Sequence, residues 1–334
     1  MQQIVLKHSL VNKPVATDFI SIDKPVPECP KDGILVKVLY ISLDPYVGSR
    51  LRGRHMGEPA PTPKTGLVPG AVVGKVLESQ AKNIILGDYV YSVEGGWAET
   101  VALPAGSFRK IDPKLAPLNT YLGALGLPGL TAWAGVTKLI DIRDGDVFMV
   151  NAASGAVGGM AGQIARLKGA KTLIGIAGGA EKWAIVTGEY GFDYCLNYKA
   201  DGWQDELKTI VPNGINIHFE NVSDTMLAFA LDHMQLYGRA ILCGLAAHYH
   251  ADGPPASVTL GRLIAKRASL HGLVVYDFYD RWDEFIAEIG PHVGNGEIKI
   301  HEHMEQGLVS APALMEKLVN GRNHGKCVIK VSED

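Results

Sequence analysis

A glycine-rich turn is the part of this sequence whose residue types and spacing best predict chemistry. Residues 147–159 place Ala152, Gly155 and Gly158 at equal spacing between an apolar run typical of a buried strand and a segment typical of a helix. In that context Gly155 lets backbone N–H groups approach a pyrophosphate, and Gly158 lets the helix pack against the strand. We expect a dinucleotide site here. The alternative is a tight turn without a ligand.

The next strand-to-helix turn predicts which dinucleotide is bound. An NAD site usually places an acidic residue at the tip of the following strand. Here that strand ends at Ala177 without a carboxylate, and Gly178, Gly179 and then Lys182 follow. Because the glycines leave space and a lysine pairs with phosphate, we expect Lys182 to meet a 2′-phosphate, and NADPH rather than NADH. The alternative for Lys182 is a solvated lysine in the first turn of a helix.

Metal ligands with suitable spacing are lacking. A catalytic zinc ion needs Cys and His ligands together with an open position for the substrate. Before residue 120 there are one cysteine and two histidines, Cys29, His8 and His55. The later histidine pairs lack the HExxH spacing and are expected to be exposed polar side chains: His248 with His250, and His301 with His303. We predict no metal site.

The sequence has two regions with different patterns, and the elements that they predict must position these residues. Between residues 34 and 103 short β-rich runs alternate with Gly and Pro, which predicts an antiparallel β domain. From Gly129 onward strands alternate with helices, which predicts a parallel sheet covered on both faces. The helix expected at 315–320 and the strand at 326–331 do not continue this rhythm, so we expect them to return to the first domain.

The sequence therefore predicts an α/β protein of two domains, which suits a chain of 334 residues. Residues 1–125 and 299–334 are expected to form a β-rich substrate domain that carries catalytic residues. Residues 126–298 are expected to form a doubly wound parallel-sheet domain that binds the cofactor.

Composition excludes several kinds of partner. With 32 Lys and Arg against 35 Asp and Glu, and no run of five like charges, the chain lacks the basic surface that nucleic acids and anionic membranes require. The uncharged stretches 115–137 and 147–165 contain Pro, Gly and amide residues, so we interpret them as buried segments rather than membrane spans. The four cysteines are far apart and form no CxxC, which favours a cytoplasmic protein.

With these features the chain resembles the zinc-independent medium-chain dehydrogenases/reductases. It is most similar to the branch that holds leukotriene hydroxydehydrogenase/prostaglandin reductases, plant alkenal double-bond reductases and bacterial curcumin reductases. The motifs that carry the resemblance run nearly end to end: SLDPY at 42–46, PGAVVG at 69–74, TAW at 131–133, AASGAVG at 152–158, EK at 181–182, NYK at 197–199, FENV at 219–222, CG at 243–244 and GK at 325–326. The resemblance implies a GroES-like first domain, a Rossmann second domain and a homodimer formed through the edge of the cofactor-domain sheet.

The resemblance also implies a set of cofactor contacts. Gly155, Ala156, Val157 and Gly158 would hold the pyrophosphate, Lys182 and Tyr198 the 2′-phosphate side, and Asn221, Cys243, Gly244, Tyr249, Leu273 and Val275 the adenosine and nicotinamide, with Asn323 reaching the cofactor from the returning segment. The alternatives are a half-buried strand aromatic for Tyr198, a turn residue for Asn221 and an apolar core thiol for Cys243.

The reaction that fits these residues is reduction of a conjugated C=C bond. Without zinc to polarise a carbonyl, addition of hydride to the β-carbon of an enone or enal is easier than reduction of a ketone, because the charge collects on an enolate oxygen that one donor can stabilise. A tyrosine suits that role, since it stays protonated at neutral pH. Relatives carry a pocket tyrosine where this chain has Ala265, so Tyr46 is our first candidate, with Tyr276 and Tyr249 after it. The alternative for Tyr46 is a packing tyrosine.

We therefore expect an NADPH-dependent 2-alkenal/enone reductase that acts on small molecules in the cleft between its domains. The alternatives are an NADPH quinone oxidoreductase, a secondary-alcohol dehydrogenase, and a non-catalytic NADPH-binding protein that kept the fold.

Overall fold

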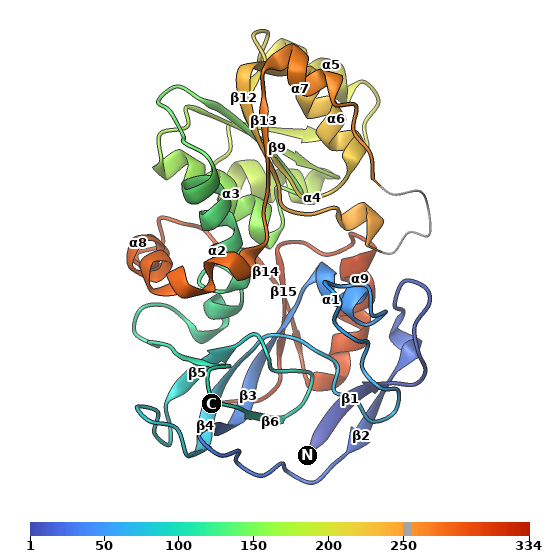
Figure 1. Cartoon of the computed structure of the whole chain (residues 1–334), viewed down its shortest axis with the longest axis vertical. Helices are drawn as coiled ribbons and strands as arrows, with labels where there is room; N and C mark the ends of the chain where they lie inside the picture. Colours follow the sequence, from blue (N-terminus) through green and yellow to red (C-terminus); the bar gives the residue numbers. More distant parts are fainter. Residues whose placement is uncertain (250–255) are drawn as a thin grey trace. The chain divides into compact units, whose positions relative to one another are not determined.

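The computed structural model describes residues 1–249 and 256–334. The chain divides into two compact units (Figure 1): unit 1 comprises Met1–Gly126 and Glu302–Asp334, and unit 2 comprises Leu127–His301. The boundaries expected from the sequence, after residues 125 and 298, lie close to these positions. The division does not test which unit carries substrate and which carries cofactor, so those roles stay predictions.

Unit 1 is built mainly of antiparallel strands. Its strands are β1 (Gln2–Leu6), β2 (Phe19–Asp23), β3 (Ile34–Leu43), β4 (Val72–Ser79), β5 (Tyr89–Ser92), β6 (Thr100–Leu103), β7 (Arg109–Lys110), β14 (Glu302–Gln306) and β15 (Lys326–Lys330). The larger sheet has the order β14-β15-β3-β4-β5-β7, with β6 also paired to β3. Eight of the ten residues of β3 are buried, which suits its central place in that sheet.

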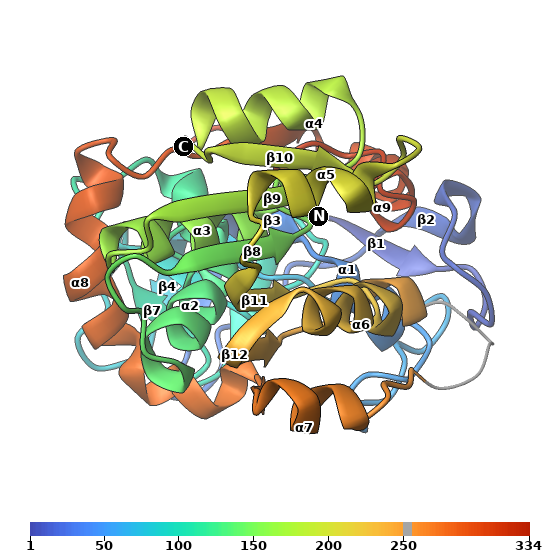
Figure 2. The same cartoon turned by 90° about the horizontal axis from the view of Figure 1, so that it is seen from above.

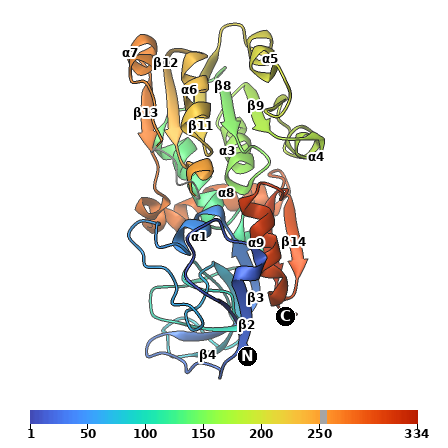
Figure 3. The same cartoon turned by 90° about the vertical axis from the view of Figure 1, so that its right-hand side faces the viewer.

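The C-terminal segment completes unit 1. Helix α9 (Ala311–Val319) is followed by β15, which pairs antiparallel with β3 so that Cys327 lies opposite Leu43 and Val328 opposite Ser42. Figure 3 shows α9 and β14 in red beside the blue β3. The buried side chains of β15 therefore belong to the same core as those of the N-terminal strands. The short helix α1 (Pro45–Arg50) follows β3 directly.

Unit 2 is a parallel sheet with helices between its strands. The strands are β8 (Val147–Asn151), β9 (Thr172–Ala177), β10 (Tyr194–Asn197), β11 (Ile215–Glu220), β12 (Met234–Leu242) and β13 (Ser269–Gly272). The helices are α2 (Leu127–Ala134), α3 (Ala156–Leu167), α4 (Ala180–Ala184), α5 (Trp203–Ile210), α6 (Asp224–Asp232), α7 (Gly261–Lys266) and α8 (Trp282–Gly294).

The strand order of unit 2 fixes where its helices lie. The order is β10-β9-β8-β11-β12-β13, so the chain starts in the middle, moves outward to β10, and returns to β11 on the other side of β8. Because parallel crossovers are right-handed, the two directions of travel place α3 and α6 on opposite faces (Figure 2). The predicted α/β fold, with a GroES-like β-rich unit and a Rossmann unit, is confirmed.

Strands and helices alternate in unit 2, as the sequence predicts from Gly129 onward. Helix α4 is short, because it passes into a π-helical turn at Ile185–Glu189. Helix α2 is buried throughout, as expected for an uncharged segment of a core. No helix within residues 1–249 and 256–334 is long and apolar enough to span a membrane.

Candidate active site

The predicted pyrophosphate turn joins β8 to α3. Ala152 adopts a left-handed conformation with φ of 49°, and Gly155 precedes α3 as its N-cap, where no side chain caps the first turn. A Cβ at Gly158 would lie 2.5 Å from the backbone oxygen of Ala152, so only glycine lets the helix approach the end of β8 this closely. Ala156 and Val157 form the first turn of α3, so the four predicted residues lie together at a helix N-terminus.

The predicted 2′-phosphate residues border the turn after β9. A Cβ at Gly178 would lie 2.7 Å from the ring of Tyr198, and Gly179 has a φ of 99°. Tyr198 lies just after β10 and is 46% exposed, so the alternative of a half-buried aromatic stays open. Lys182 lies on α4, which packs against β10. The structure thus places both predicted residues near one glycine turn.

A buried carboxylate joins the ends of β8 and β11. Glu220, which is fully buried, accepts hydrogen bonds at Oε1 from Asn151 Nδ2 at 2.5 Å and from the backbone N–H groups of Val222 and Ser223 at 2.6 and 2.8 Å. Its Oε2 lies 2.8 Å from Nε2 of the buried His218, which therefore donates to the carboxylate. These bonds hold the carboxyl ends of the two strands at the point where the strand order reverses, which is where open α/β sheets bind ligands.

Asn221 also joins the ends of β8 and β11. Its backbone N–H donates to Asn151 Oδ1 at 2.7 Å, and its side-chain amide donates to the backbone oxygen of Asn151 at 3.1 Å. Asn221 thus ties the two strand ends together, which a structural turn residue also does, so that alternative stays open.

The segment after β12 gathers the next predicted residues. The N–H groups of Cys243 and Gly244 both donate to the backbone oxygen of Glu220, at 2.9 and 3.1 Å. A Cβ at Gly244 would lie 2.9 Å from the Tyr249 hydroxyl and 3.3 Å from the backbone oxygen of Asn221. The structure thus brings Asn221, Cys243, Gly244 and Tyr249 together.

Burial keeps two of these groups neutral. It raises the pKa of the Cys243 thiol to about 12, with the Glu220 carboxylate adding to the effect. The thiol is buried although the residue as a whole is only partly so, and the alternative of an apolar core thiol stays open. Burial and the nearby Cys243 raise the pKa of Tyr249, against an opposing hydrogen bond with the backbone of Leu245. Both groups therefore hold their protons at neutral pH.

The segment after β13 lies beside that cluster. Leu273 is buried, and its N–H donates to the backbone oxygen of Leu242 at 3.0 Å, directly before Cys243. Val275 and Tyr276 are partly buried in a 3-10 helix, and the Tyr276 ring lies 5.4 Å from that of Tyr279. Ala265, where relatives carry a tyrosine, is exposed on α7.

Tyr46 and Asn323 belong to unit 1. Tyr46 is partly buried on α1, packs against the core, and has its ring 5.0 Å from that of His55. Burial lowers the pKa of His55, with Arg50 acting in the same direction and Glu58 against it. Asn323 precedes β15, and its side-chain amide donates to the backbone oxygen of Gly325 at 3.1 Å. The packing alternative for Tyr46 stays open.

The histidines expected to be exposed are partly buried, so that expectation is wrong for His248, His301 and His303. Each lies against a different carboxylate: His248 against Asp224 at 3.0 Å, His301 against Glu189 at 3.0 Å and His303 against Glu305 at 3.6 Å. His250 lies outside the described residues. Across the part of the chain that the structure describes, no group of three or more His, Cys, Asp or Glu side chains could hold a metal ion. The expectation of no metal site stays a prediction.

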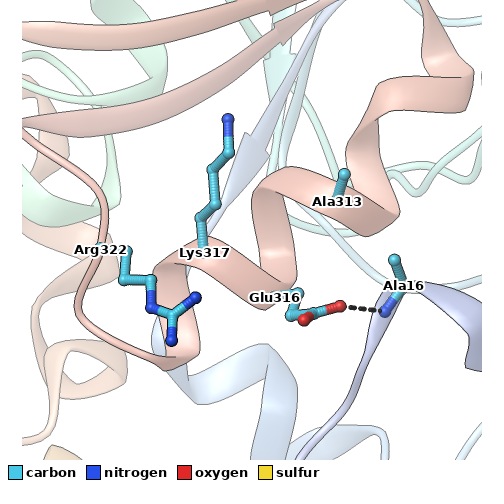
Figure 4. Close-up of a pocket in the computed structure, with 5 residues that line it drawn as sticks. All are labelled: Ala16, Ala313, Glu316, Lys317 and Arg322. Carbon is cyan, nitrogen blue, oxygen red and sulfur yellow. Dashed lines mark hydrogen bonds between the residues drawn. The ribbon is translucent and has the colours of Figure 1, made fainter.

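Unit 1 contains a pocket of about 210 Å³. It is lined by Ala16, Ala313, Glu316, Lys317 and Arg322 (Figure 4). The Glu316 carboxylate accepts from the N–H of Ala16 at 2.7 Å, and Lys317 Nζ lies 3.1 Å from Glu305. No predicted site residue lines this pocket, so it does not define the site.

Known proteins match this chain along its whole length. Residues 156–290 match a family model described as zinc-binding dehydrogenase, and residues 2–111 match one described as the N-terminal domain of oxidoreductase. The chain is 37% identical to the 2-alkenal reductase (NADP(+)-dependent) of Nicotiana tabacum, over 100% of this chain and 98% of that protein. The chain belongs to the zinc-independent medium-chain dehydrogenases/reductases. The resemblance seen in the sequence is thereby confirmed.

Two further relatives of this medium-chain reductase extend the comparison. The NADPH-dependent curcumin reductase of Escherichia coli is 35% identical, over 90% of this chain and 88% of that protein. The crystal structure of CurA from Vibrio vulnificus in complex with NADPH is 33% identical, with a TM-score of 0.89 and 100% of each chain covered.

Sequence reasoning gave no role to Asn151 and Glu220 in this medium-chain reductase. A signal was present: Asn151 ends the apolar run 147–150, and His218 and Glu220 lie two residues apart on one face of a buried strand. Polar residues at such positions need partners, which predicts a network. Their mutual contact needs the pairing of β8 with β11, which the local sequence does not show.

Replacing Gly158 by alanine tests the close approach of α3. The added Cβ meets backbone atoms of Asn151 and Ala152 that cannot rotate away, so we expect Gly158→Ala to lower the free energy of unfolding by about 1–3 kcal/mol. The control is Gly188→Ala in the π-helical turn, where a Cβ meets nothing within 4 Å and a gain of about 0.4–1 kcal/mol is expected. Denaturant unfolding measures both. Equal effects of the two substitutions would contradict the close approach.

Proposed function

We propose that this protein reduces the C=C bond of α,β-unsaturated aldehydes and ketones with NADPH. The observation that carries the proposal is the full-length similarity to a 2-alkenal reductase, with 37% identity over 100% of this chain. The curcumin reductase relative supports the same class of conjugated substrate. The proposal assigns the cofactor to unit 2 and the substrate to unit 1.

The residues of unit 2 fit a dinucleotide that carries a 2′-phosphate. The uncapped first turn of α3 offers backbone N–H groups to a pyrophosphate at Gly155–Gly158. The tip of β9 at Ala177 carries no carboxylate, so an extra phosphate there would meet a cation from Lys182 and a hydroxyl from Tyr198. Asn221, Cys243, Gly244, Leu273, Val275 and Asn323 are the further proposed contacts. When bound, NADPH supplies the hydride.

The proposed role of this chain in the chemistry is to stabilise an enolate oxygen. Tyr46 is the proposed donor: its hydroxyl would hydrogen-bond the carbonyl oxygen as charge develops there. Tyr249 and Tyr276 are the other candidates, and the raised pKa of Tyr249 keeps its hydroxyl a donor at neutral pH. A proton taken up at the α-carbon completes the saturated product.

We further propose that two copies pair through the β13 edge of unit 2. Large apolar side chains are exposed on and near β12 and α7: Leu236 (55%), Tyr237 (68%), Leu260 (66%) and Ile264 (79%). A sheet edge beside exposed apolar side chains favours pairing with another copy. Light scattering that returned the mass of one chain would contradict the homodimer.

A cytoplasmic location belongs to the same proposal. In the part of the chain that the structure describes, no disulfide joins any of the four cysteines, Cys29, Cys195, Cys243 and Cys327, which suits a reducing compartment. Recovery of the protein outside the cytoplasmic fraction of its cells would contradict this location.

The direct test is NADPH consumption across a panel of enals, aryl enones, conjugated diketones and quinones, with product identification. We expect enals and enones to yield products that keep the carbonyl and lose the C=C bond. Their kcat/KM should exceed that of quinones by at least about tenfold, which is about 1.4 kcal/mol of transition-state stabilisation. Turnover of quinones alone would favour a quinone oxidoreductase, an alcohol product a carbonyl reductase, and binding without turnover a non-catalytic protein.

Lys182→Ala tests the choice of cofactor. Loss of a charge-assisted contact with the 2′-phosphate is expected to lower kcat/KM with NADPH by about 10- to 100-fold and to leave the value with NADH unchanged. Lys208→Ala on α5 is the control, since that exposed lysine pairs with Asp205 and should change neither value. An unchanged ratio of the two kcat/KM values for Lys182→Ala would remove the phosphate role.

Tyr46→Phe tests the proposed donor. The substitution removes one hydroxyl and keeps the ring that packs on the core, so we expect kcat with an enone to fall by about 100-fold. Tyr237→Phe, at a tyrosine that is 68% exposed in unit 2, should have no effect. If Tyr46→Phe kept the full kcat and Tyr276→Phe lost it, Tyr276 rather than Tyr46 would be the donor.

A further inference from the structure

Unit 1 contains a buried ion pair that the proposed chemistry does not use. Lys326 begins β15 and Asp44 follows β3, and the Lys326 ammonium lies 2.7 Å from Asp44 Oδ1. The two side chains are only 3% and 12% exposed. An ammonium ion this deeply buried needs a full set of acceptors.

The ammonium has that full set. It donates to Ser42 Oγ at 2.5 Å, to the backbone oxygen of Leu43 at 2.9 Å and to Asp44 Oδ1 at 2.7 Å, which matches its three N–H groups. The Ser42 hydroxyl in turn donates to Asp44 Oδ2. The lysine stem packs at Gly123, where a Cβ would lie 3.3 Å from Lys326 Cγ. Each N–H group of the ammonium therefore has an acceptor, and these hydrogen bonds hold Lys326, Ser42 and Asp44 in one geometry.

Strand pairing alone does not require these charges. β15 and β3 already pair through buried residues such as Val328 and Ile329. A buried ion pair is often no more stabilising than apolar side chains of similar size, because both charges lose their hydration. What the pair adds is a fixed position for the atoms that it joins.

The carboxylate of Asp44 does not cap the helix that follows it. Asp44 is the N-cap residue of α1, where an aspartate commonly accepts a hydrogen bond from the first turn, yet it makes no such bond. Both of its oxygens bond to Lys326 and Ser42 instead. The start of α1 is therefore fixed to β15 rather than to its own helix.

The two chain segments that meet at this pair carry the proposed site residues of unit 1. Tyr46 is the second residue of α1, directly after Asp44 and Pro45. Asn323 lies just before Lys326 and is tied by its side chain to Gly325. We propose that the Lys326–Asp44 ion pair is a positioning device that holds the Tyr46 turn and the Asn323 segment in one fixed arrangement for catalysis. This inference rests on the proposed function.

The test separates positioning from stability by exchanging the charges for apolar side chains. Lys326→Met alone leaves Asp44 buried without its cation, so both the melting temperature and kcat with an enone should fall. The double variant Lys326→Met, Asp44→Leu removes both charges, so the melting temperature should return toward the wild-type value. Its kcat should stay lower by about 10- to 100-fold, because a small misplacement of a donor has an effect of that size. Recovery of kcat together with stability would overturn the positioning role.

A second buried ion pair supplies the control. Arg239 and Asp146 in unit 2 are 10% and 6% exposed and lie 2.7 Å apart, and neither belongs to the proposed site. Arg239→Met should lower the melting temperature much as Lys326→Met does and leave kcat unchanged at a temperature where the protein is folded. An equal loss of kcat in Arg239→Met would show that the effect in Lys326→Met comes from stability alone.

Amide hydrogen exchange gives a measurement that does not depend on enone turnover. In the double variant, peptides covering residues 42–50 and 320–326 should exchange faster than in the wild type, with no change in unit 2. If the wild type reduces no enone and these peptides still loosen, the proposed function fails and the positioning device stands as a structural one. If the wild type reduces enones and the double variant keeps both wild-type exchange and wild-type kcat, the further inference fails alone.

Asp44→Asn covers the case in which the apolar pair does not restore the melting temperature. It keeps the shape of the side chain and removes its charge. Lower kcat with faster exchange in the two segments would support the positioning role, and wild-type values of both would overturn it.

Discussion

The contact between the ends of β8 and β11 is the constraint on which unit 2 depends. The chain enters its sheet in the middle, so two strands far apart in sequence become neighbours, and the polar groups at their carboxyl ends must be satisfied there. Glu220 does this by accepting bonds from Asn151 and from the backbone that follows β11. The glycine turn after β8 and the Cys243 segment after β12 both begin at this contact between strand ends. Glu220 thus fixes the strand ends through its carboxylate, while its backbone oxygen holds the N–H groups of the proposed contacts Cys243 and Gly244.

In unit 1, too, strands that are far apart in sequence become neighbours, and there a buried lysine joins them. The C-terminal strand joins the sheet beside β3, and the residues before that strand must be fixed relative to the turn after β3. Here the buried charge is a lysine at the start of β15, and its acceptors are the last two residues of β3 and Asp44, which follows them. In both units a buried polar side chain with several hydrogen bonds fixes a strand terminus next to proposed site residues.

Local sequence was sufficient wherever the feature is local. The turn at Gly155–Gly158 and the turn after Ala177 each lie within one strand-to-helix connection, so glycine spacing and the missing carboxylate predicted both. Contacts between distant segments could not be predicted in this way. Asn151 and Glu220 are 69 residues apart, and Lys326 and Asp44 are 282 apart, so their pairing appears only once the strand order is known. The expectation that His301 is exposed was wrong for the same reason. His301 contacts Glu189, which is distant in sequence, so local sequence does not show this contact.

The electrostatics of the proposed site suit hydride addition to a conjugated bond better than chemistry that needs a charged side chain. Burial raises the pKa of Cys243 to about 12 and also raises that of Tyr249, while it lowers that of His55 beside Tyr46. A raised acid pKa and a lowered histidine pKa both favour the neutral form, so at neutral pH these three groups carry no charge. Since these three groups supply no charge, the proposed chemistry depends on the geometry of its hydrogen-bond donors. The buried Lys326–Asp44 pair, which joins the end of β3 to the start of β15, would therefore bear on that chemistry without touching the substrate.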